Sequence, residues 1–147
     1  MKIITENREA RHNYFLESPI EAGLVLLGSE VKSIRAGKVN LKDSYAVIRG
    51  GEIFLLNCFI SSFEKTGSFV PDERRTRKLL LKKQEIEKLQ RKIKEQGYTL
   101  VPTKVYFSGD YAKVEIALAK GKKNYDKKQD IKKSDLKRYA ERQLADR

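Results

Sequence analysis

The stretch Tyr98-Thr-Leu-Val-Pro-Thr-Lys-Val-Tyr-Phe107 is followed, after Ser108-Gly-Asp110, by Tyr111-Ala-Lys-Val-Glu-Ile-Ala-Leu-Ala119. Both segments are rich in β-branched and aromatic residues, and the short Gly-containing segment between them is typical of a hairpin turn. In the second segment, Val114, Ile116 and Leu118 alternate with Lys113 and Glu115, so one face of the strand is predicted to be wet. This stretch therefore predicts an antiparallel hairpin over 98–107 and 111–119.

Four more strands and two helices are predicted on the N-terminal side of this hairpin. A helix over 84–96 is indicated by Ile86, Leu89 and Ile93 at helical spacing, and a second helix over 29–36 begins at the N-cap residue Ser29. Strands are expected at 12–17, 20–27, 40–48 and 52–60, with turns at Ser18-Pro19 and Gly50-Gly51. Residues 61–77 lack periodicity and are interpreted as an exposed loop.

This order of elements predicts a mainly β fold. Six antiparallel strands, with one helix after the second strand and another after the fourth, fit an oligonucleotide-binding-type barrel with flanking helices and a basic C-terminal tail. Such barrels bind RNA on one face and its loops. We expect residues 1–119 to form this barrel as a single domain.

Residues 120–147 form the basic tail. They carry eleven Lys/Arg against five Asp/Glu, which is +6 of the chain's +12. Apolar side chains are sparse there, too few to offset an ordering entropy of about 1–2 kcal/mol per residue. We expect the tail to be disordered when free and to fold against a polyanion, with nucleic acid as the favoured partner.

Composition argues against several kinds of chemistry. One His and one Cys cannot supply a usual zinc site, and neither a metal nor another cofactor is expected. No nucleophile has an evident base beside it, and Gly121-Lys122 lacks the pattern of a phosphate-binding loop. Cys58 lies in an apolar run and is predicted to be a buried, inert thiol. Without a signal peptide or a long apolar stretch, the protein is expected to be soluble and cytoplasmic, with no membrane partner.

Three basic stretches carry the interpretation as an RNA-binding protein: Arg8–Arg11, Arg74–Lys78 and the tail. Lys and Arg side chains neutralise phosphates and release counterions, and unpaired bases stack on neighbouring aromatic rings. The aromatic residues concerned are Tyr14, Phe15, Phe63, Tyr106, Tyr111 and Tyr125. Tyr14, Phe15 and Tyr106 are also candidates for the core, which we favour for Phe15. A solvated basic surface on a thermostable protein is the plainer alternative, but the concentration of charge favours phosphate binding.

Longer sequence motifs in the chain are a more specific signal than these basic stretches. They are Asn7-Arg-Glu-Ala-Arg-His-Asn-Tyr-Phe15, Glu21-Ala-Gly23, Gly28-Ser-Glu-Val-Lys-Ser-Ile-Arg-Ala-Gly-Lys38, Leu41-Lys-Asp-Ser-Tyr45, Arg75-Thr-Arg-Lys-Leu-Leu-Leu81 and Ala117-Leu-Ala-Lys-Gly-Lys-Lys123. In order and spacing they closely resemble the small protein B family, the bacterial proteins that bind transfer-messenger RNA.

The resemblance implies an oligonucleotide-binding-type barrel that is not an enzyme. Members of that family bind the tRNA-like domain of transfer-messenger RNA, and alanyl-tRNA synthetase and elongation factor Tu are partners indirectly, through the RNA. They help place this RNA in the A site of a stalled ribosome, where the tail occupies the decoding site and folds as a helix along the empty mRNA channel. The ribosome is thereby rescued and the nascent chain is tagged. We expect a monomer.

Individual site residues follow from the same resemblance. Asn7, Glu21 and Leu80 match positions important for RNA binding, and His12 matches one expected near the decoding site. Glu21 could instead brace an Arg, Leu80 could be core, and His12 could have no role. The predicted RNA-binding set is Asn7, Arg8, Arg11, His12, Glu21, Lys32, Arg35, Lys38, Arg75, Arg77, Lys78 and Leu80. The tail residues predicted to meet the ribosome and its mRNA channel are Lys120, Gly121, Lys122, Lys123, Asp126, Lys127, Lys128, Ile131, Lys132 and Lys133.

The chain departs from the family pattern at two places. Lys128 stands where the family usually has Arg, so a bidentate fork is lost while the charge stays. The loop before Arg75 reads Pro71-Asp-Glu-Arg74, whereas the family usually has Asp-Pro there.

A basic structural protein of the ribosome remains the alternative, and it would accompany every ribosome rather than follow transfer-messenger RNA. A nuclease would need a cluster of carboxylates for a metal, which no segment convincingly offers.

Overall fold

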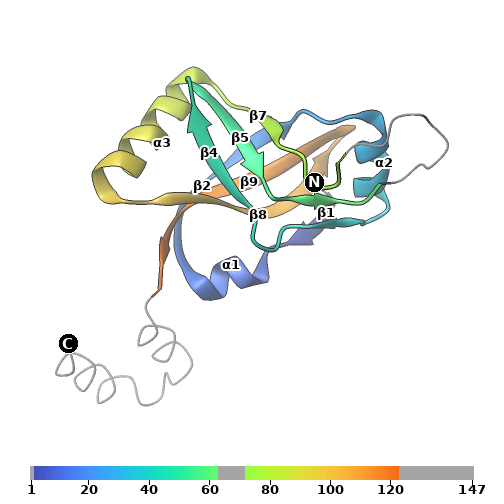
Figure 1. Cartoon of the computed structure of the whole chain (residues 1–147), viewed down its shortest axis with the longest axis horizontal. Coiled ribbons are helices and arrows are strands. Elements are labelled where there is room, and N and C mark those ends of the chain that lie inside the picture. Colours follow the sequence, from blue (N-terminus) through green and yellow to red (C-terminus); the bar gives the residue numbers. More distant parts are fainter. Residues whose placement is uncertain (1, 63–71, 123–147) are drawn as a thin grey trace, which may run out of the picture.

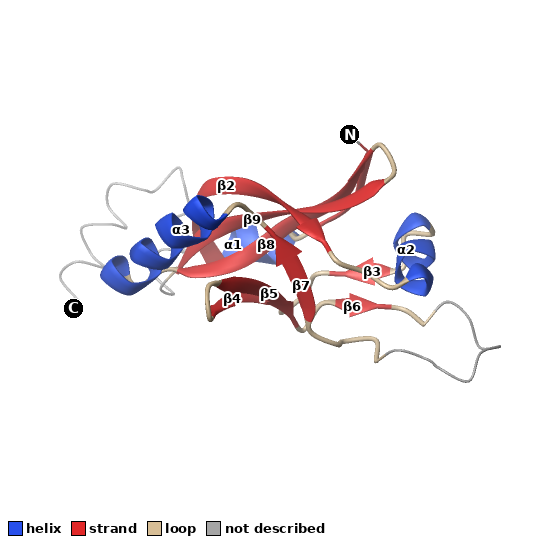
Figure 2. Cartoon of the chain, turned by 90° about the horizontal axis from the view of Figure 1, so that it is seen from above, coloured by secondary structure: helices blue, strands red, loops and turns tan. Residues whose placement is uncertain are grey.

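The computed structural model describes residues 2–62 and 72–122. Within these ranges the elements follow in the order β1 (Lys2–Glu6), α1 (Arg8–Asn13), β2 (Tyr14–Leu24), α2 (Gly28–Arg35), β3 (Val39–Asn40), β4 (Tyr45–Arg49), β5 (Glu52–Leu56), β6 (Phe59–Ile60), β7 (Arg77–Leu80), α3 (Lys83–Gln96), β8 (Thr99–Ser108) and β9 (Tyr111–Gly121). Figure 1 shows α3 and α2 at opposite ends of the strands, and Figure 2 shows the same arrangement from above.

Six strands close into a ring. The sheet runs in the order β8-β4-β5-β7-β2-β9, and β9 pairs again with β8. All of these pairings are antiparallel. β1 pairs with the second half of β8, where Lys2 lies opposite Phe107. The predicted six-stranded barrel with flanking helices is therefore confirmed.

The hairpin that carried the prediction is confirmed nearly to the residue. β8 and β9 pair from Thr99 opposite Ala119 to Ser108 opposite Tyr111, with a register shift between Pro102 and Lys104. The shift accommodates Pro102, which has no N–H to donate to a ladder. The inward side chains of these strands, among them Leu100, Ile116 and Leu118, form the centre of the core.

The N-terminal quarter differs from the prediction. A strand was expected to begin at His12, but the chain forms the helix α1 there, because Asn7 caps it by accepting a hydrogen bond from the Ala10 amide at 3.1 Å. The two strands expected around a turn at Ser18-Pro19 are one strand, β2. The ladder of β2 with β9 shifts register between Glu17 and Ile20, so Ser18-Pro19 is a bulge and not a turn.

The sixth strand of the barrel is β7, which lies at the end of the segment interpreted as a loop. Its side chains are alternately buried and exposed, and it joins β5 to β2. The sequence did not predict this strand because its first buried residue is an arginine, Arg77. A hydrophobic pattern assigns an arginine to the surface.

The two strands expected at 40–48 and 52–60 are each broken in two. Asp43 and Asn57 both have positive φ, 63° and 60°, and the chain bends at each. The Asn57 side-chain amide donates to the Asp43 carbonyl oxygen at 3.1 Å, which ties the two bends together. The helices expected at 29–36 and 84–96 are confirmed as α2 and α3, and α3 buries Ile86 and Leu89 as its stripe predicted. The N-cap predicted for the first of them is wrong, because α2 begins at Gly28 and its N-cap residue is Leu27 and not Ser29.

Candidate nucleic-acid interface

The short helix α1 presents three cationic or titratable side chains to solvent. Arg8, Arg11 and His12 are all exposed on it, and Arg11 lies 3.3 Å from the Glu6 carboxylate. Asn7, in contrast, is only 6% exposed, and its side-chain amide donates to the Pro102 carbonyl oxygen at 2.9 Å. Asn7 thus fixes α1 against β8, and its side chain faces the protein rather than the solvent.

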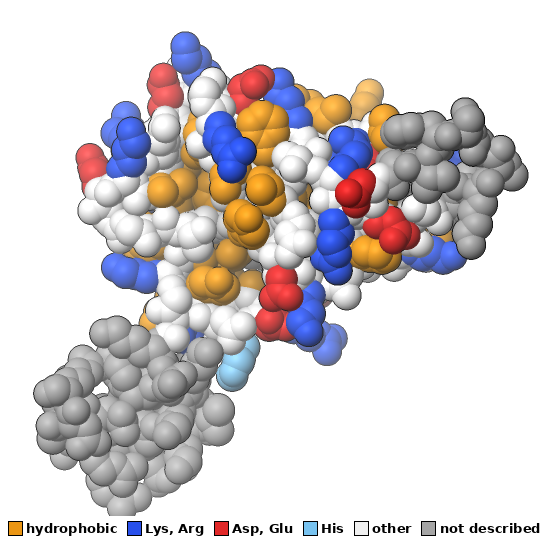
Figure 3. All heavy atoms as spheres, viewed as in Figure 1, with side chains coloured by type: hydrophobic (Ala, Val, Ile, Leu, Met, Phe, Trp, Pro, Cys, Tyr) orange, Lys and Arg blue, Asp and Glu red, His pale blue; other side chains and the backbone are white. Residues whose placement is uncertain are grey.

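The C-terminal segment leaves the barrel beside this helix. The Lys122 amide donates to the Asn13 carbonyl oxygen at 2.9 Å, so the last described residue is held at the end of α1. Figure 3 shows the one histidine of the chain, His12, at the surface of the molecule. Lys120, Gly121 and Lys122 therefore lie close to α1. The other predicted tail residues, Lys123, Asp126, Lys127, Lys128, Ile131, Lys132 and Lys133, lie outside the described residues.

Two aromatic rings accompany these lysines. Phe15 is 51% exposed, so the core position that we favoured for it is wrong. The Lys122 ammonium lies 5.1 Å from the Phe15 ring centroid, and the Lys120 ammonium lies 5.6 Å from that of Tyr98. Tyr14 is half-buried against Ala10 and Val101. Exposed rings with cations over them are suited to stacking on bases and to neutralising phosphates.

Glu21 and Leu80 share a second surface. Leu80 is 56% exposed and not core, and it lies opposite Gly23 in the β2–β7 ladder. A Cβ atom at Gly23 would come within 3.3 Å of the Leu80 Cβ, so glycine lets Leu80 lie over β2. Glu21 projects from the same face as Gly23 because the two are two residues apart in one strand.

The carboxylate of Glu21 has a fixed donor that the sequence did not reveal. The buried Tyr106 hydroxyl donates to Glu21 Oε1 at 2.5 Å. Burial, and then the hydrogen bond to this carboxylate, raise the pKa of Tyr106 well above its ordinary value, so the hydroxyl remains a donor. Among the described residues, Glu21 forms no ion pair with an arginine. Its exposed side chain keeps its second oxygen, Oε2, as an acceptor.

Of the basic cluster Arg75, Arg77 and Lys78, one member is internal. The Arg77 side chain is 0% exposed and donates to Glu30 of α2 and, at 2.5 Å, to the Cys58 carbonyl oxygen. Arg75 is partly exposed and also binds Glu30, at 2.7 Å, while the exposed Lys78 pairs with Glu52 at 2.5 Å. The RNA contact predicted for Arg77 is therefore not supported by its geometry, and its burial gives it a structural role.

The cations of α2 and its C-terminal side are exposed. They are Lys32, Arg35 and Lys38. The Arg35 guanidinium stacks 4.6 Å above the Phe107 ring centroid, which orients this exposed side chain. The predicted residues thus fall on three surfaces: around α1 and the start of the tail, around Glu21 and Leu80, and on α2.

Within the part of the chain that the structure describes, no group of three or more His, Cys, Asp or Glu side chains could hold a metal ion. None of the helices among these residues is long and apolar enough to cross a membrane. Cys58 is 1% exposed, and burial raises the pKa of its thiol to about 11, as expected for an inert cysteine.

These features define an oligonucleotide-binding-type barrel with exposed cationic and aromatic surfaces. The family model described as SmpB protein matches residues 4–146, and the chain belongs to that family. The chain is 53% identical over 146 residues, 99% of its length and 94% of the relative's, to the SsrA-binding protein of Bacillus pumilus. It is 55% identical over 145 residues, 98% of its length and 92% of the relative's, to the SsrA-binding protein of Symbiobacterium thermophilum.

A solved structure agrees with these relatives. It is described as "tmRNA-SmpB: a journey to the center of the bacterial ribosome", and its chain is 46% identical to this one with a TM-score of 0.69. The match covers 87% of this chain and 94% of the solved chain. At this identity, the likeness extends beyond the fold to the protein family.

Proposed function

We propose that this protein binds transfer-messenger RNA, the SsrA RNA, and acts with it in trans-translation on the ribosome. It is an RNA-binding protein and not an enzyme. Support comes from relatives named for SsrA binding, which match nearly the whole chain, and from a solved relative described with this RNA in the ribosome. The observation that carries the proposal in this chain is the position of Lys122 against Asn13, at the end of α1, the helix that carries Arg8, Arg11 and His12.

The barrel and the tail have separate tasks in this proposal. The barrel, with Glu21, Leu80 and the exposed cations of α1 and α2, binds the tRNA-like domain. His12 lies at the decoding site, and the tail, disordered when free, becomes helical in the empty mRNA channel. Alanyl-tRNA synthetase and elongation factor Tu act on the same RNA and are indirect partners. The protein works as a monomer in the cytoplasm, where ribosomes translate.

The test is specific binding of the tRNA-like domain by the barrel. The full chain and a chain ending at Lys122 are titrated with this RNA and with a tRNA of similar size, in the same salt. We expect both proteins to prefer the tRNA-like domain, and the shorter one to lose only a non-specific electrostatic share of affinity. Equal affinity of the full chain for both RNAs would contradict transfer-messenger RNA binding, and loss of preference on shortening would place recognition in the tail.

A structural protein of the ribosome is separated from this proposal by stoichiometry. Captured from cells, the protein should carry one dominant structured RNA and should fall to substoichiometric levels on ribosomes when that RNA is deleted. Constant occupancy of every ribosome would favour the structural role.

A further inference from the structure

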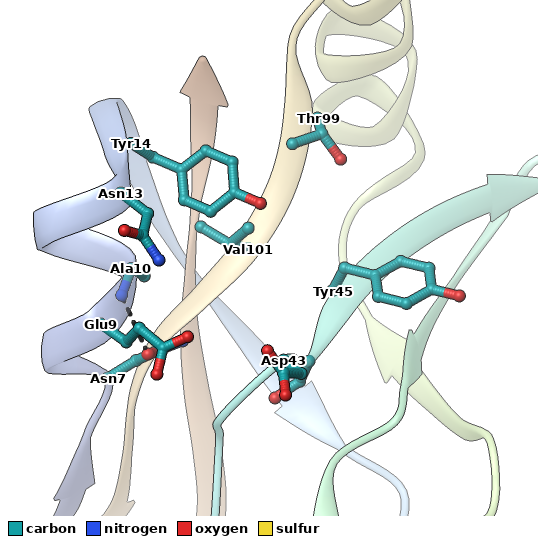
Figure 4. Close-up of a pocket in the computed structure, with 10 residues that line it drawn as sticks. Asn7, Glu9, Ala10, Asn13, Tyr14, Asp43, Tyr45, Thr99 and Val101 are labelled. Carbon is teal, nitrogen blue, oxygen red and sulfur yellow. Dashed lines mark hydrogen bonds between the residues drawn. The ribbon is translucent and has the colours of Figure 1, made fainter. Parts of the chain in front are cut away.

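An open pocket of about 250 Å³ lies between α1 and the turn that leads into β4. Figure 4 shows Glu9, Asn13 and Tyr14 on one side and Asp43 and Tyr45 on the other, with Val101 of β8 between them. The pocket is lined by Asn7, Glu9, Ala10, Asn13, Tyr14, Asp43, Ser44, Tyr45, Thr99 and Val101. Tyr45 closes one of the strings that carry the family resemblance, yet it has no assigned role.

The lining is layered from apolar at the bottom to acidic at the rim. Ala10 and Val101 are buried and form an apolar floor. Tyr14 is half-buried and Tyr45 is 42% exposed, so both offer ring surface to the space. Glu9 and Asp43 are exposed at the rim, and the positive φ of Asp43 is held by the hydrogen bond from Asn57 to its carbonyl oxygen. The walls are therefore set by the fold before a ligand arrives.

The charge of the pocket is opposite to that of its surroundings. Within the described ranges, no Lys or Arg lines it, although the chain has a net charge of +12. Arg8, Arg11 and Lys42 are the exposed neighbours of the lining residues in the sequence. Carboxylates repel phosphate and accept hydrogen bonds from N–H groups, while the flanking cations attract phosphate. A nucleotide strand would place phosphates on the flanks and a base in the pocket.

We propose that this pocket receives one unpaired RNA base that carries an exocyclic amino group. Its flat face stacks on Tyr45 or Tyr14, and its amino group donates to Asp43 or Glu9, as adenine, cytosine and guanine allow and uracil does not. The inference rests on the proposed function, because it deepens RNA binding by naming a base site. The base belongs either to the tRNA-like domain or to ribosomal RNA, and the chemistry of recognition is the same for both.

The experiment uses two variants and a matched control. Tyr45→Leu removes the ring while keeping an apolar side chain, and Asp43→Asn keeps a residue that tolerates positive φ while removing the charge. Ile3→Ala is the control, because Ile3 is an exposed apolar side chain, 45% exposed, and lies opposite Tyr106, toward the end of β8 that is far from Thr99. All three should unfold at the same temperature as the wild type, since each changed side chain is exposed.

Affinity and photo-crosslinking are measured with the tRNA-like domain alone and with full transfer-messenger RNA on stalled ribosomes. In the measurement whose RNA contains the bound base, we expect Tyr45→Leu to weaken binding at least about fivefold. This is the lower end of the affinity lost when one base–aromatic stack is removed. Ultraviolet crosslinks read by mass spectrometry should join Tyr14 or Tyr45 to an adenine, cytosine or guanine. Asp43→Asn should reduce the preference for that base over a uracil substituted at its position.

The two arms distinguish the sources of the base, and either source supports the proposal. If Tyr45→Leu matches Ile3→Ala in both arms, or if neither Tyr14 nor Tyr45 crosslinks in either arm, the base pocket is refuted. Failure of the wild-type protein to prefer the tRNA-like domain over a tRNA would instead refute the proposed function. Failure of the base pocket and failure of the proposed function therefore give different results.

Discussion

Two nitrogens of Arg77, Nε and Nη2, donate to a single carboxylate oxygen of Glu30, at 3.0 and 2.7 Å, and both side chains are buried. The same carboxylate accepts from Arg75 Nε at 2.9 Å and from the Leu27 amide at 2.8 Å. One glutamate therefore joins α2 to the start of the barrel strand β7. Removing it would leave an arginine charge in the interior without its partner.

Glu30→Gln should cost about 3–5 kcal/mol in the free energy of unfolding, the range for breaking a buried ion pair. Urea unfolding followed by circular dichroism measures this. Glu52→Gln is the control, because Glu52 pairs with Lys78 on the surface and should cost less than about 1 kcal/mol. Equal costs for the two variants would contradict the central role of Glu30.

The same carboxylate should make stability depend on acid. Burial alone would raise the pKa of Glu30, but hydrogen bonds from Arg75, the Leu27 amide and Arg77 together outweigh it, so the pKa lies below the ordinary 4.5. A lowered pKa in the folded state means that the contribution is complete above pH 4.5 and is lost as pH falls through the folded-state pKa. Unfolding free energies measured from pH 6 downward should fall more steeply for the wild type than for Glu30→Gln. Parallel curves would show that Glu30 titrates normally.

Tyr106→Phe should weaken binding of the tRNA-like domain by roughly three- to tenfold, because it removes the hydroxyl that orients Glu21, a net hydrogen bond of about 1 kcal/mol. Filter binding measures the affinity. Tyr98→Phe is the matched control, since the Tyr98 hydroxyl donates to Glu17, farther along β2.

A double-mutant cycle distinguishes orientation of Glu21 by Tyr106 from a purely structural role of Tyr106. If Tyr106 acts through Glu21, Tyr106→Phe should have no further effect on binding in a Glu21→Ala background. Additive losses would mean that the two residues act independently.

The exposed arginines of α1 should determine part of the salt dependence of RNA binding. Replacing Arg8 and Arg11 by Gln should reduce the slope of log affinity against log salt by about 1.4–1.8, at roughly 0.7–0.9 per phosphate contact. Arg91→Gln with Lys94→Gln removes the same charge from the exposed face of α3 and serves as the control. If both pairs lower the slope equally, only the net charge matters and α1 makes no defined contact.

Proline at Lys133 should separate RNA binding from tagging. Proline in a helix interior costs about 3 kcal/mol, so a tail that must become helical in the mRNA channel should fail there. The variant should bind the tRNA-like domain like the wild type but should not support tagging on stalled ribosomes in a reconstituted translation assay. Normal tagging would indicate that the tail acts as a flexible tether of charge.

The barrel could be predicted because its longest elements have local patterns. The alternation in 111–119 and the stripe of Ile86, Leu89 and Ile93 depend on neighbouring residues only, and both are confirmed as β9 and α3. The errors lie where a distant contact decides the local structure. Ser18-Pro19 is a bulge because β9 continues to pair on both sides of it, and Arg77 is a strand residue because Glu30, 47 positions away, neutralises it.

The candidate site could be predicted in part for the same reason. Exposed cations such as Arg8, Arg11 and Lys32 could be recognised from local composition. Asn7 and Arg77 could not be separated from them, because their burial follows from partners on β8 and α2. The pocket beside Tyr45 also arises from segments far apart in the chain, and no local pattern marks it.

The buried thiol of Cys58 has a practical consequence. With a pKa of about 11, it is ionised in only about one molecule in a thousand at pH 8, and it is shielded by the barrel. A second cysteine placed on the surface or in the tail would react with a maleimide dye long before Cys58 does. The wild-type chain is therefore a suitable background for single-site labelling at an introduced cysteine, and reaction of Cys58 itself would report the opening of the barrel.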